Sequence, residues 1–316
     1  MKKTRNKKEK SLKTDAQVTI VLTSKEIQEF QLLIMDWYSD HAREGLPWRA
    51  TDRTAYQVLI SEVMLQQTQV DRTIPFFQKW IKRFPDFQSL SSAPQRDLLG
   101  YWKGLGYNSR ALRLKKLAQR VIDEYAGVLP KRYDTLCSLP GIGPYTAGAV
   151  RAFAFGEATP IIETNIRRVC IHHFEKELEL YDFSDKAILS IVQQLIPEQS
   201  NISIADWYWA LMDYGSQLPK ELGHNPNKKS KSYTRQKKFQ GSDRQVRGTI
   251  IEILLTSPSG GVVYESLFEE VRDQIIKKAP GDPLTRSRFE KIHSDLDMEG
   301  FIVNENISGQ VHVGLR

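Results

Sequence analysis

The run Leu-Pro-Gly-Ile-Gly-Pro-Tyr-Thr-Ala-Gly-Ala at residues 139–149 constrains the fold of this chain more than any other stretch. Gly141 and Gly143 flank Ile142, and both glycines can adopt backbone conformations that other residues avoid. Pro144 suits the first turn of a helix, because that position has no backbone hydrogen bond to lose. The pattern predicts a tight hairpin leading into a closely packed helix, with outward-facing amides that could hold a phosphate.

The composition is that of a soluble globular chain of two or three domains. Of its 316 residues, 40% are hydrophobic and 26% are charged. No apolar run reaches the ~20 residues that span a bilayer, and the charged N-terminus lacks the apolar block of a signal peptide. Cys137 and Cys170 are too few for a disulfide framework and show no metal-ligand spacing. We therefore expect a reducing, cytosolic setting and no membrane partner.

The net charge of +7 is concentrated in two segments. Residues 1–14 carry a net charge of +6 and residues 220–247 carry +7, which leaves the rest of the chain acidic. Flexible basic segments add salt-sensitive affinity for polyanions. On charge alone, a solubilising tail is an equally good interpretation.

Helical periodicity dominates the chain and predicts a mainly α fold. We expect a basic flexible tail at 1–23, a two-lobed helical core at 24–219, a basic linker or mobile loop at 220–242, and a small C-terminal domain at 243–316. Three helices and a two-stranded hairpin in that last segment fit an α/β winged-helix-like module. The predicted helices of the core begin or run at 24–37, 56–65, 75–84, 89–99, 110–125, 146–155, 186–195 and 204–214, with Ser24 as the first N-cap.

Two carboxylates are candidates for chemistry. Glu62 lies within an otherwise apolar helical pattern, so it is paired, at the edge of a cleft, or functional. Glu163 lies where a loop enters a helix, and by itself it is best interpreted as a carboxylate favoured by the helix dipole. A pair of carboxylates is what cleavage of a glycosidic bond requires. The sequence alone does not show that the two meet.

Five pieces of the sequence belong together: Leu-Pro-Trp-Arg at 46–49, Ser-Glu-Val-Met-Leu-Gln-Gln-Thr-Gln at 61–69, Gly-Leu-Gly-Tyr at 104–107, the hairpin at 139–148, and Ala-Leu-Met-Asp at 210–213. Together they resemble the helix-hairpin-helix-GPD (HhH-GPD) superfamily of DNA glycosylases, and within it the MutY-type adenine glycosylases. The resemblance spans roughly residues 25–216, in the order and close to the spacing of the family. The run at 61–69 is the most specific part, whereas the hairpin marks only the wider superfamily.

The resemblance implies a role for each matching residue. Glu62 corresponds to the catalytic acid, and Tyr145 occupies the position of the lysine nucleophile in the glycosylase/lyases. It also implies a duplex-probing role for Gln66, Gln67 and Gln69, a phosphate-binding hairpin with a monovalent cation at Gly141, Ile142 and Gly143, and a base pocket lined by Trp48 and Arg49. Arg49 fits a buried salt bridge equally well. The implied partner is double-stranded DNA with a mispaired or damaged base, bound by a monomer in the bacterial cytoplasm at the nucleoid, or in a nucleus.

Three departures from the family pattern qualify this. Glu163 stands where the family has a catalytic aspartate, which puts the charge one methylene farther out. The four cysteines that would bind an iron–sulfur cluster after residue 213 are missing, so we expect no cluster. The segment 243–316 does not resemble the Nudix-like domain of MutY proteins. In addition, Trp209 replaces an adenine-binding glutamate, and it is either a core residue or a platform for the flipped base.

Three functions remain open on this evidence. The first is a monofunctional glycosylase that flips and removes adenine opposite G or 8-oxoguanine in base excision repair. The second keeps the fold but removes another base, such as thymine or uracil from G mispairs, or a modified base. The third is a non-catalytic DNA-binding damage sensor or regulator, which the intact Glu62 disfavours.

Overall fold

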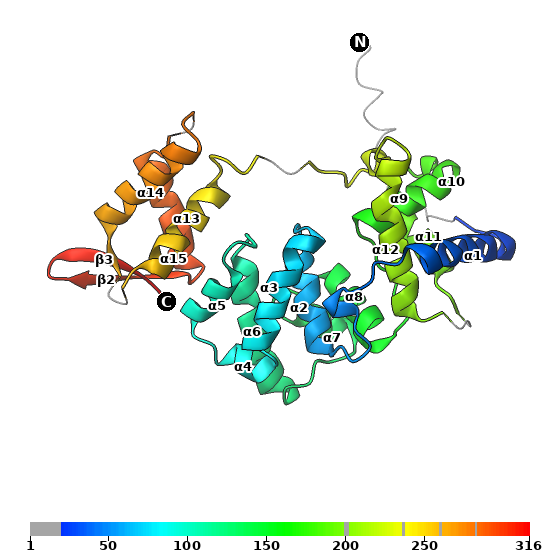
Figure 1. The fold of residues 1–316 in the computed structure, drawn as a ribbon, viewed down its shortest axis with the longest axis horizontal. Helices are drawn as coiled ribbons and strands as arrows, with labels where there is room; N and C mark the ends of the chain where they lie inside the picture. The colour runs from blue at the N-terminus through cyan, green and yellow to red at the C-terminus, as the bar shows by residue number, and fades with distance from the viewer. Residues whose placement is uncertain (1–19, 199–201, 236–237, 259–260, 282) are drawn as a thin grey trace, which may run out of the picture. The chain divides into compact units, whose positions relative to one another are not determined.

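The computed structural model describes residues 20–198, 202–235, 238–258, 261–281 and 283–316, and the basic tail predicted for the first residues lies almost wholly outside them. The described part of the chain is mainly helical, as predicted, and Figure 1 shows the elements in chain order. Within these ranges no helix combines the length and the apolar character that a membrane span requires. The chain divides into two compact units, each assembled from two separate stretches of sequence.

The first unit combines the described part of Met1–Gly45 with Ala147–Thr234. In Figure 1 the blue helix α1 lies with the green helices α9 to α12, despite its distance from them in the sequence. Its elements are α1 (Ser24–His41), most of α8 (Pro144–Phe155), α9 (Thr164–His173), α10 (Glu175–Glu179), α11 (Asp185–Leu195), α12 (Ile204–Glu221) and the 3-10 helix η3 (Pro226–Lys229).

The start of α1 differs from the prediction by one residue. Thr23, not Ser24, is the N-cap, because its side chain accepts the Glu26 N–H at 3.2 Å while Glu26 accepts the Thr23 N–H at 2.7 Å. This capping box satisfies two amides that the helix itself cannot bond. Phe30 and Ile34, one turn apart, then bury the inner face of α1.

Helices α9 and α12 pack closely at Gly215. A Cβ atom on Gly215 would overlap the backbone of Asn165, so only glycine permits this approach. Pro219 lies inside α12 and has no N–H for the carbonyl of Gly215, four residues earlier. Arg168 of α9 donates to that carbonyl at 3.4 Å. Arg168 thus supplies the hydrogen bond that Pro219 cannot donate to this carbonyl. Helix α12 extends to Glu221, well past the predicted end at 214.

Parts of the predicted tail and linker are packed rather than flexible. Ile20 and Leu22 are buried, and the Gln194 amide bonds the backbone of both residues at 2.9 Å. In the predicted linker, α12 continues to residue 221 and Pro226 of η3 is buried. Lys229 pairs with Glu175 at 2.6 Å, which fastens the segment to α10. These packed portions correct the prediction, while residues 236–237 lie outside the described part.

The second unit combines Leu46–Thr146 with Arg235–Arg316. Residues 262–315 add a small antiparallel sheet of order β1-β3-β2, with Val262 opposite Val313 and Ile302 opposite Leu315. The predicted three helices and hairpin are present, and β1 is an additional two-residue strand. The elements are η2 (Pro47–Arg49), α2 (Ala55–Leu65), α3 (Val70–Arg83), α4 (Phe87–Ser91), α5 (Gln95–Trp102), α6 (Ser109–Tyr125), α7 (Tyr133–Ser138), α13 (Asp243–Thr256), β1 (Val262–Val263), α14 (Tyr264–Lys278), α15 (Arg286–Met298), β2 (Ile302–Ile307) and β3 (Gln310–Leu315).

Two helix boundaries in this unit differ from the prediction because of prolines. The single helix expected at 89–99 is two helices, α4 and α5, since Pro94 lacks an N–H and disfavours helical backbone in Ala93. Helix α3 begins at Val70, five residues before its expected start, and Pro75 lies inside the helix.

The two compact units do not follow the predicted domain boundaries. Residues 235–316 are grouped with residues 46–146, so the boundaries at 219 and 243 stay predictions.

His173 gives the first unit a pH-dependent stability. Its ring packs edge-on against Phe30 at 5.2 Å and its Nε2 lies 3.1 Å from the Tyr214 hydroxyl. Burial lowers the pKa of His173 from 6.5 to about 4. Because the unfolded chain binds this proton more tightly, the free energy of unfolding falls as the pH drops from about 6.5 toward about 4, by the order of 2 kcal/mol.

Urea unfolding at pH 7 and pH 5 tests this expectation. The variant His173→Gln should lose less stability than the wild type between the two pH values. The variant His224→Gln, an exposed change in the same unit, serves as the control and should behave as the wild type. An equal loss in all three proteins would contradict the assignment.

Candidate functional site

The glycine hairpin connects α7 to α8 in the second unit. Ile142 is its buried centre and donates its N–H to the Leu139 carbonyl at 3.2 Å, while Gly141 and Gly143 are exposed. Gly141 has φ +82°, as expected of a turn glycine, but Gly143 is not in the left-handed region. Helix α8 starts with Pro144 directly after the turn. The predicted phosphate and cation sites at this helix start stay predictions.

Helix α2 places Glu62 beside the first turn of α8. The helix is apolar on nearly all sides, and Glu62 is buried with 7% of its surface exposed. The hydroxyl of Tyr145, in the first turn of α8, donates a hydrogen bond to Glu62 Oε2 at 2.9 Å. A buried carboxylate needs such a partner, because an unpaired one costs several kcal/mol. Two predicted site residues, 83 positions apart, are therefore in direct contact.

Arg110 fixes the C-terminal end of α2, one turn beyond Glu62. Its guanidinium is buried and donates to backbone carbonyls of both α2 and the Gly-rich turn at 104–108. Burial lowers the pKa of Arg110 to about 10, so it stays charged at neutral pH. The accepting carbonyls are those of Val63 at 2.7 Å, Met64 at 3.1 Å, Gln66 at 2.8 Å, Leu105 at 3.2 Å and Gly106 at 2.9 Å.

The glutamine loop, residues 66–69, follows directly. Gln66 reaches Thr146 Oγ1 of α8 at 3.4 Å. Gln67 is exposed and has φ +57°, and its amide oxygen accepts a hydrogen bond from the Tyr107 hydroxyl at 2.6 Å. Tyr107 also has a positive φ, of 49°. Gln69 is exposed and precedes α3 as its N-cap. Left-handed backbone in residues other than glycine is strained and clusters at functional sites.

The three predicted base-pocket residues divide between the units. Trp48 of η2 is buried and packs edge-on against Phe77 at 5.5 Å, and the half-buried Arg49 follows it. Trp209 belongs to the first unit, where it is buried and stacks on Phe153 with ring planes 10° apart. Both tryptophans are thus core residues of their units. Their contact with a flipped base stays a prediction.

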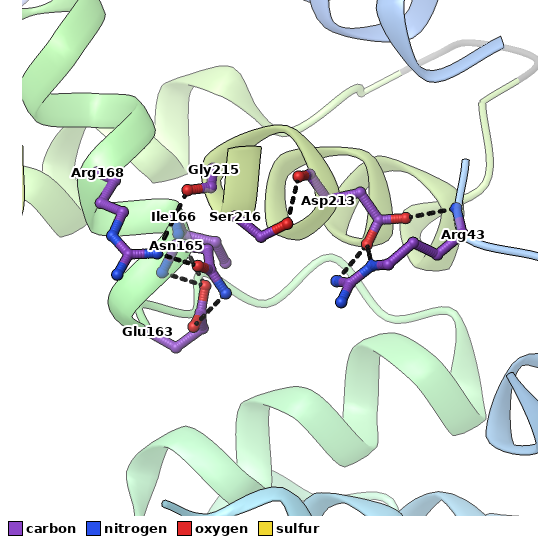
Figure 2. Close-up of polar contacts among 8 residues, drawn as sticks. All are labelled: Arg43, Glu163, Asn165, Ile166, Arg168, Asp213, Gly215 and Ser216. Carbon is purple, nitrogen blue, oxygen red and sulfur yellow. Dashed lines mark hydrogen bonds and ion pairs between the residues drawn. The ribbon is translucent and has the colours of Figure 1, made fainter. Parts of the chain in front are cut away.

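Glu163 is the N-cap of α9 in the first unit (Figure 2). Its Oε1 accepts the N–H groups of Asn165 at 2.6 Å and Ile166 at 2.8 Å, and Oε2 accepts from the Asn165 side chain at 3.2 Å. Burial raises the pKa of the carboxyl group, and the two amides and Arg168 oppose that rise. The local role is the helix-entry interpretation that the sequence favours. Because Glu62 belongs to the other unit, a shared cleft stays a prediction.

A buried ion pair in the first unit was not anticipated from the sequence. Asp213 is 1% exposed, and its oxygens accept from the backbone N–H of Arg43 at 3.0 Å and from Arg43 Nε at 2.6 Å (Figure 2). This contact ties the residues after α1 to α12. The sequence signal for this ion pair is the charged Asp213 at the end of the apolar run Ala-Leu-Met.

Comparison with known proteins identifies the class of this fold. Residues 60–194 match the model of the HhH-GPD superfamily of base excision DNA repair proteins. A solved structure of a thermostable thymine-DNA glycosylase is 29% identical, with a TM-score of 0.55, over 61% of this chain and 87% of that one. The segment that matches the superfamily model therefore includes both Glu62 and Glu163.

Curated relatives give the particular family. The adenine DNA glycosylase of Mycolicibacterium smegmatis is 35% identical over 238 residues, which cover 71% of this chain and 80% of the relative. The human adenine DNA glycosylase is 42% identical over 152 residues, 46% of this chain and 28% of the human protein. The chain belongs to the adenine DNA glycosylase family, whose members are DNA N-glycosylases of base excision repair.

Replacing Arg110 should destabilise the second unit. Arg110→Met leaves several buried carbonyls unsatisfied, and each costs about 1–3 kcal/mol, so we expect a loss of about 3 kcal/mol or more. Arg110→Lys retains the charge but not the planar set of donors and should fall in between. Urea unfolding measures both variants against Lys116→Met, an exposed change on the same helix. A loss in Arg110→Met no larger than in this control would contradict the role.

The capping role of Glu163 makes a separate prediction. Glu163→Ala removes the acceptor of two amides and should lower the unfolding free energy by about 1–2 kcal/mol. Glu163→Asp supplies another good N-cap and should recover most of that loss. Thermal unfolding of the three proteins tests the order, and an unchanged stability in Glu163→Ala would rule out the cap.

Proposed function

We propose that this protein removes adenine from A:G and A:8-oxoguanine mispairs by hydrolysis of the N-glycosidic bond. The observation that carries the proposal is the buried Glu62, held by the Tyr145 hydroxyl beside the glycine hairpin. The names of the relatives support adenine as the base.

The proposed chemistry follows from a carboxyl group in a low-dielectric site. Glu62 donates a proton to the base, the bond between C1′ and the base nitrogen breaks, and the electron pair leaves with the neutral base. A water molecule then attacks C1′ and gives its proton to the Glu62 carboxylate, which restores the acid. The Tyr145 hydrogen bond holds Glu62 in one rotamer for both steps. Glu163 is proposed as the second carboxylate, which stabilises the positive charge on the sugar.

Tyr145 also decides the proposed reaction class. A phenol cannot form the Schiff base through which a lysine cleaves the DNA strand. We therefore propose a monofunctional enzyme that leaves an abasic site. We also propose, from the family resemblance alone, that it acts as a monomer. We further propose that it works without an iron–sulfur cluster, since such a cluster is held by four cysteines and the chain has two.

The substrate test uses fluorescent duplexes with A opposite G or 8-oxoguanine. Wild-type protein should produce strand breaks only after alkali, which reveals abasic sites. Glu62→Gln should lower the single-turnover rate by about a hundredfold or more while still binding the duplex. The control is Glu29→Gln, an exposed change on α1 that should keep full activity. No alkali-dependent cleavage of any A mispair by the wild type would overturn the adenine assignment.

A second candidate is removal of thymine from T:G mispairs. The similarity to a thymine-DNA glycosylase structure, together with Trp209 in place of the family's glutamate, favours testing it. Duplexes with T:G and U:G belong in the same panel. Activity confined to A mispairs would exclude this candidate.

A further inference from the structure

A groove of about 860 Å³ lies within the second unit, between the glutamine loop, the Gly-rich turn and α13. The C-terminal module, residues 235–316, forms one of its walls. Ionisable side chains along the groove are mostly basic. They are Arg72, Lys103, Arg244, Arg247 and Lys278, with Glu252 as the acidic member.

Hydrogen bonds connect the module to the glutamine loop across this groove. Arg244 of α13 donates to the Tyr107 hydroxyl at 2.6 Å, and Tyr107 donates in turn to Gln67 at 2.6 Å. The Arg244 guanidinium also lies over the Tyr107 ring, 5.4 Å from its centre. The two left-handed residues, Gln67 and Tyr107, are therefore positioned in part by the C-terminal module.

Further contacts hold the module against α5. Gln95 donates to the carbonyls of Gly300 and Phe301 at 3.0 Å each, and Arg96 donates to the Leu255 carbonyl at 2.7 Å. Lys103 pairs with Glu252 at 2.8 Å. These contacts hold the C-terminal module in place, so the groove has a fixed wall on each side.

The lining chemistry matches a nucleic-acid strand. Lys103 pairs with Glu252 and Arg247 pairs with Glu299 at 2.6 Å, and the other charged side chains along the groove are basic. A groove with an excess of positive charge attracts phosphates. Two aromatic rings also line the groove, those of Tyr107 and Phe239, and the Arg244 guanidinium lies 5.4 Å and 5.9 Å from their centres. Arg72 donates to the neutral Gly104 carbonyl, so this contact leaves its positive charge in place.

We propose that this groove binds the sugar-phosphate backbone of one DNA strand beside Gln67, which makes the C-terminal module part of the DNA-binding surface. The proposal rests on duplex DNA being the substrate. In this proposal Arg244 positions Tyr107. Lys278, which is exposed at the end of α14, contacts a phosphate of the DNA strand.

Two adjacent lysines provide a matched test. Lys277 and Lys278 are both exposed in the last turn of α14, but only Lys278 lines the groove. Each would be changed to alanine in the Glu62→Gln background, and binding to an A:8-oxoguanine duplex would be measured by fluorescence anisotropy between about 50 and 200 mM salt. Lys278→Ala should weaken binding several-fold and reduce the slope of log Kd against log salt by about 1. Lys277→Ala should leave the slope close to that of the parent.

Arg244→Ala provides a second measurement. It should weaken binding by more than Lys278→Ala does, with Arg272→Ala on α14 as the control and thermal unfolding to verify folding. Equal affinities and slopes for Lys278→Ala and Lys277→Ala would overturn the proposal. Failure of the proposed function is seen separately, as absence of base release by the protein with Glu62 intact, whereas the binding slopes report on the groove alone.

Discussion

One buried guanidinium, that of Arg110, holds together the part of the second unit on which the site depends. It bonds carbonyls at the end of α2 and in the Gly-rich turn, so it fixes Glu62 on one side and Tyr107 on the other. A planar fork of donors can satisfy several carbonyls at once, which a lysine cannot do. Burial lowers the pKa of Arg110 to about 10, which still leaves the guanidinium charged at neutral pH.

The contact between Glu62 and Tyr145 shows how a helix, a turn and a second helix combine into a site. Helix α2 supplies an apolar surrounding, the hairpin brings α8 alongside, and the phenol at the start of α8 meets the carboxylate. In the proposed mechanism the same phenol also stands in place of a lysine nucleophile. Under that proposal, Tyr145 both positions Glu62 and determines the class of chemistry.

The sequence predicted the helical class, the hairpin and most helices, because apolar periodicity and turn residues act locally. Glu62 and Tyr145 were both chosen as candidates, but their contact depends on packing between segments 83 residues apart. The extension of α12 beyond Pro219 could not be predicted, since the carbonyl that the proline leaves is bonded by Arg168 from another helix. The pair of Arg43 with Asp213 was missed for the same reason.

The division of the chain into discontinuous units has a consequence for how the protein folds. The backbone passes from one unit to the other near residues 45, 146 and 234, so neither unit is a single continuous segment. Helix α1 can complete its core only after α11 and α12 have been synthesised, more than 140 residues later. Contacts of such long range slow folding. A fragment cut near residue 146 would leave both units incomplete, whereas a cut near residue 45 keeps all of the second unit and a cut near residue 234 keeps all of the first.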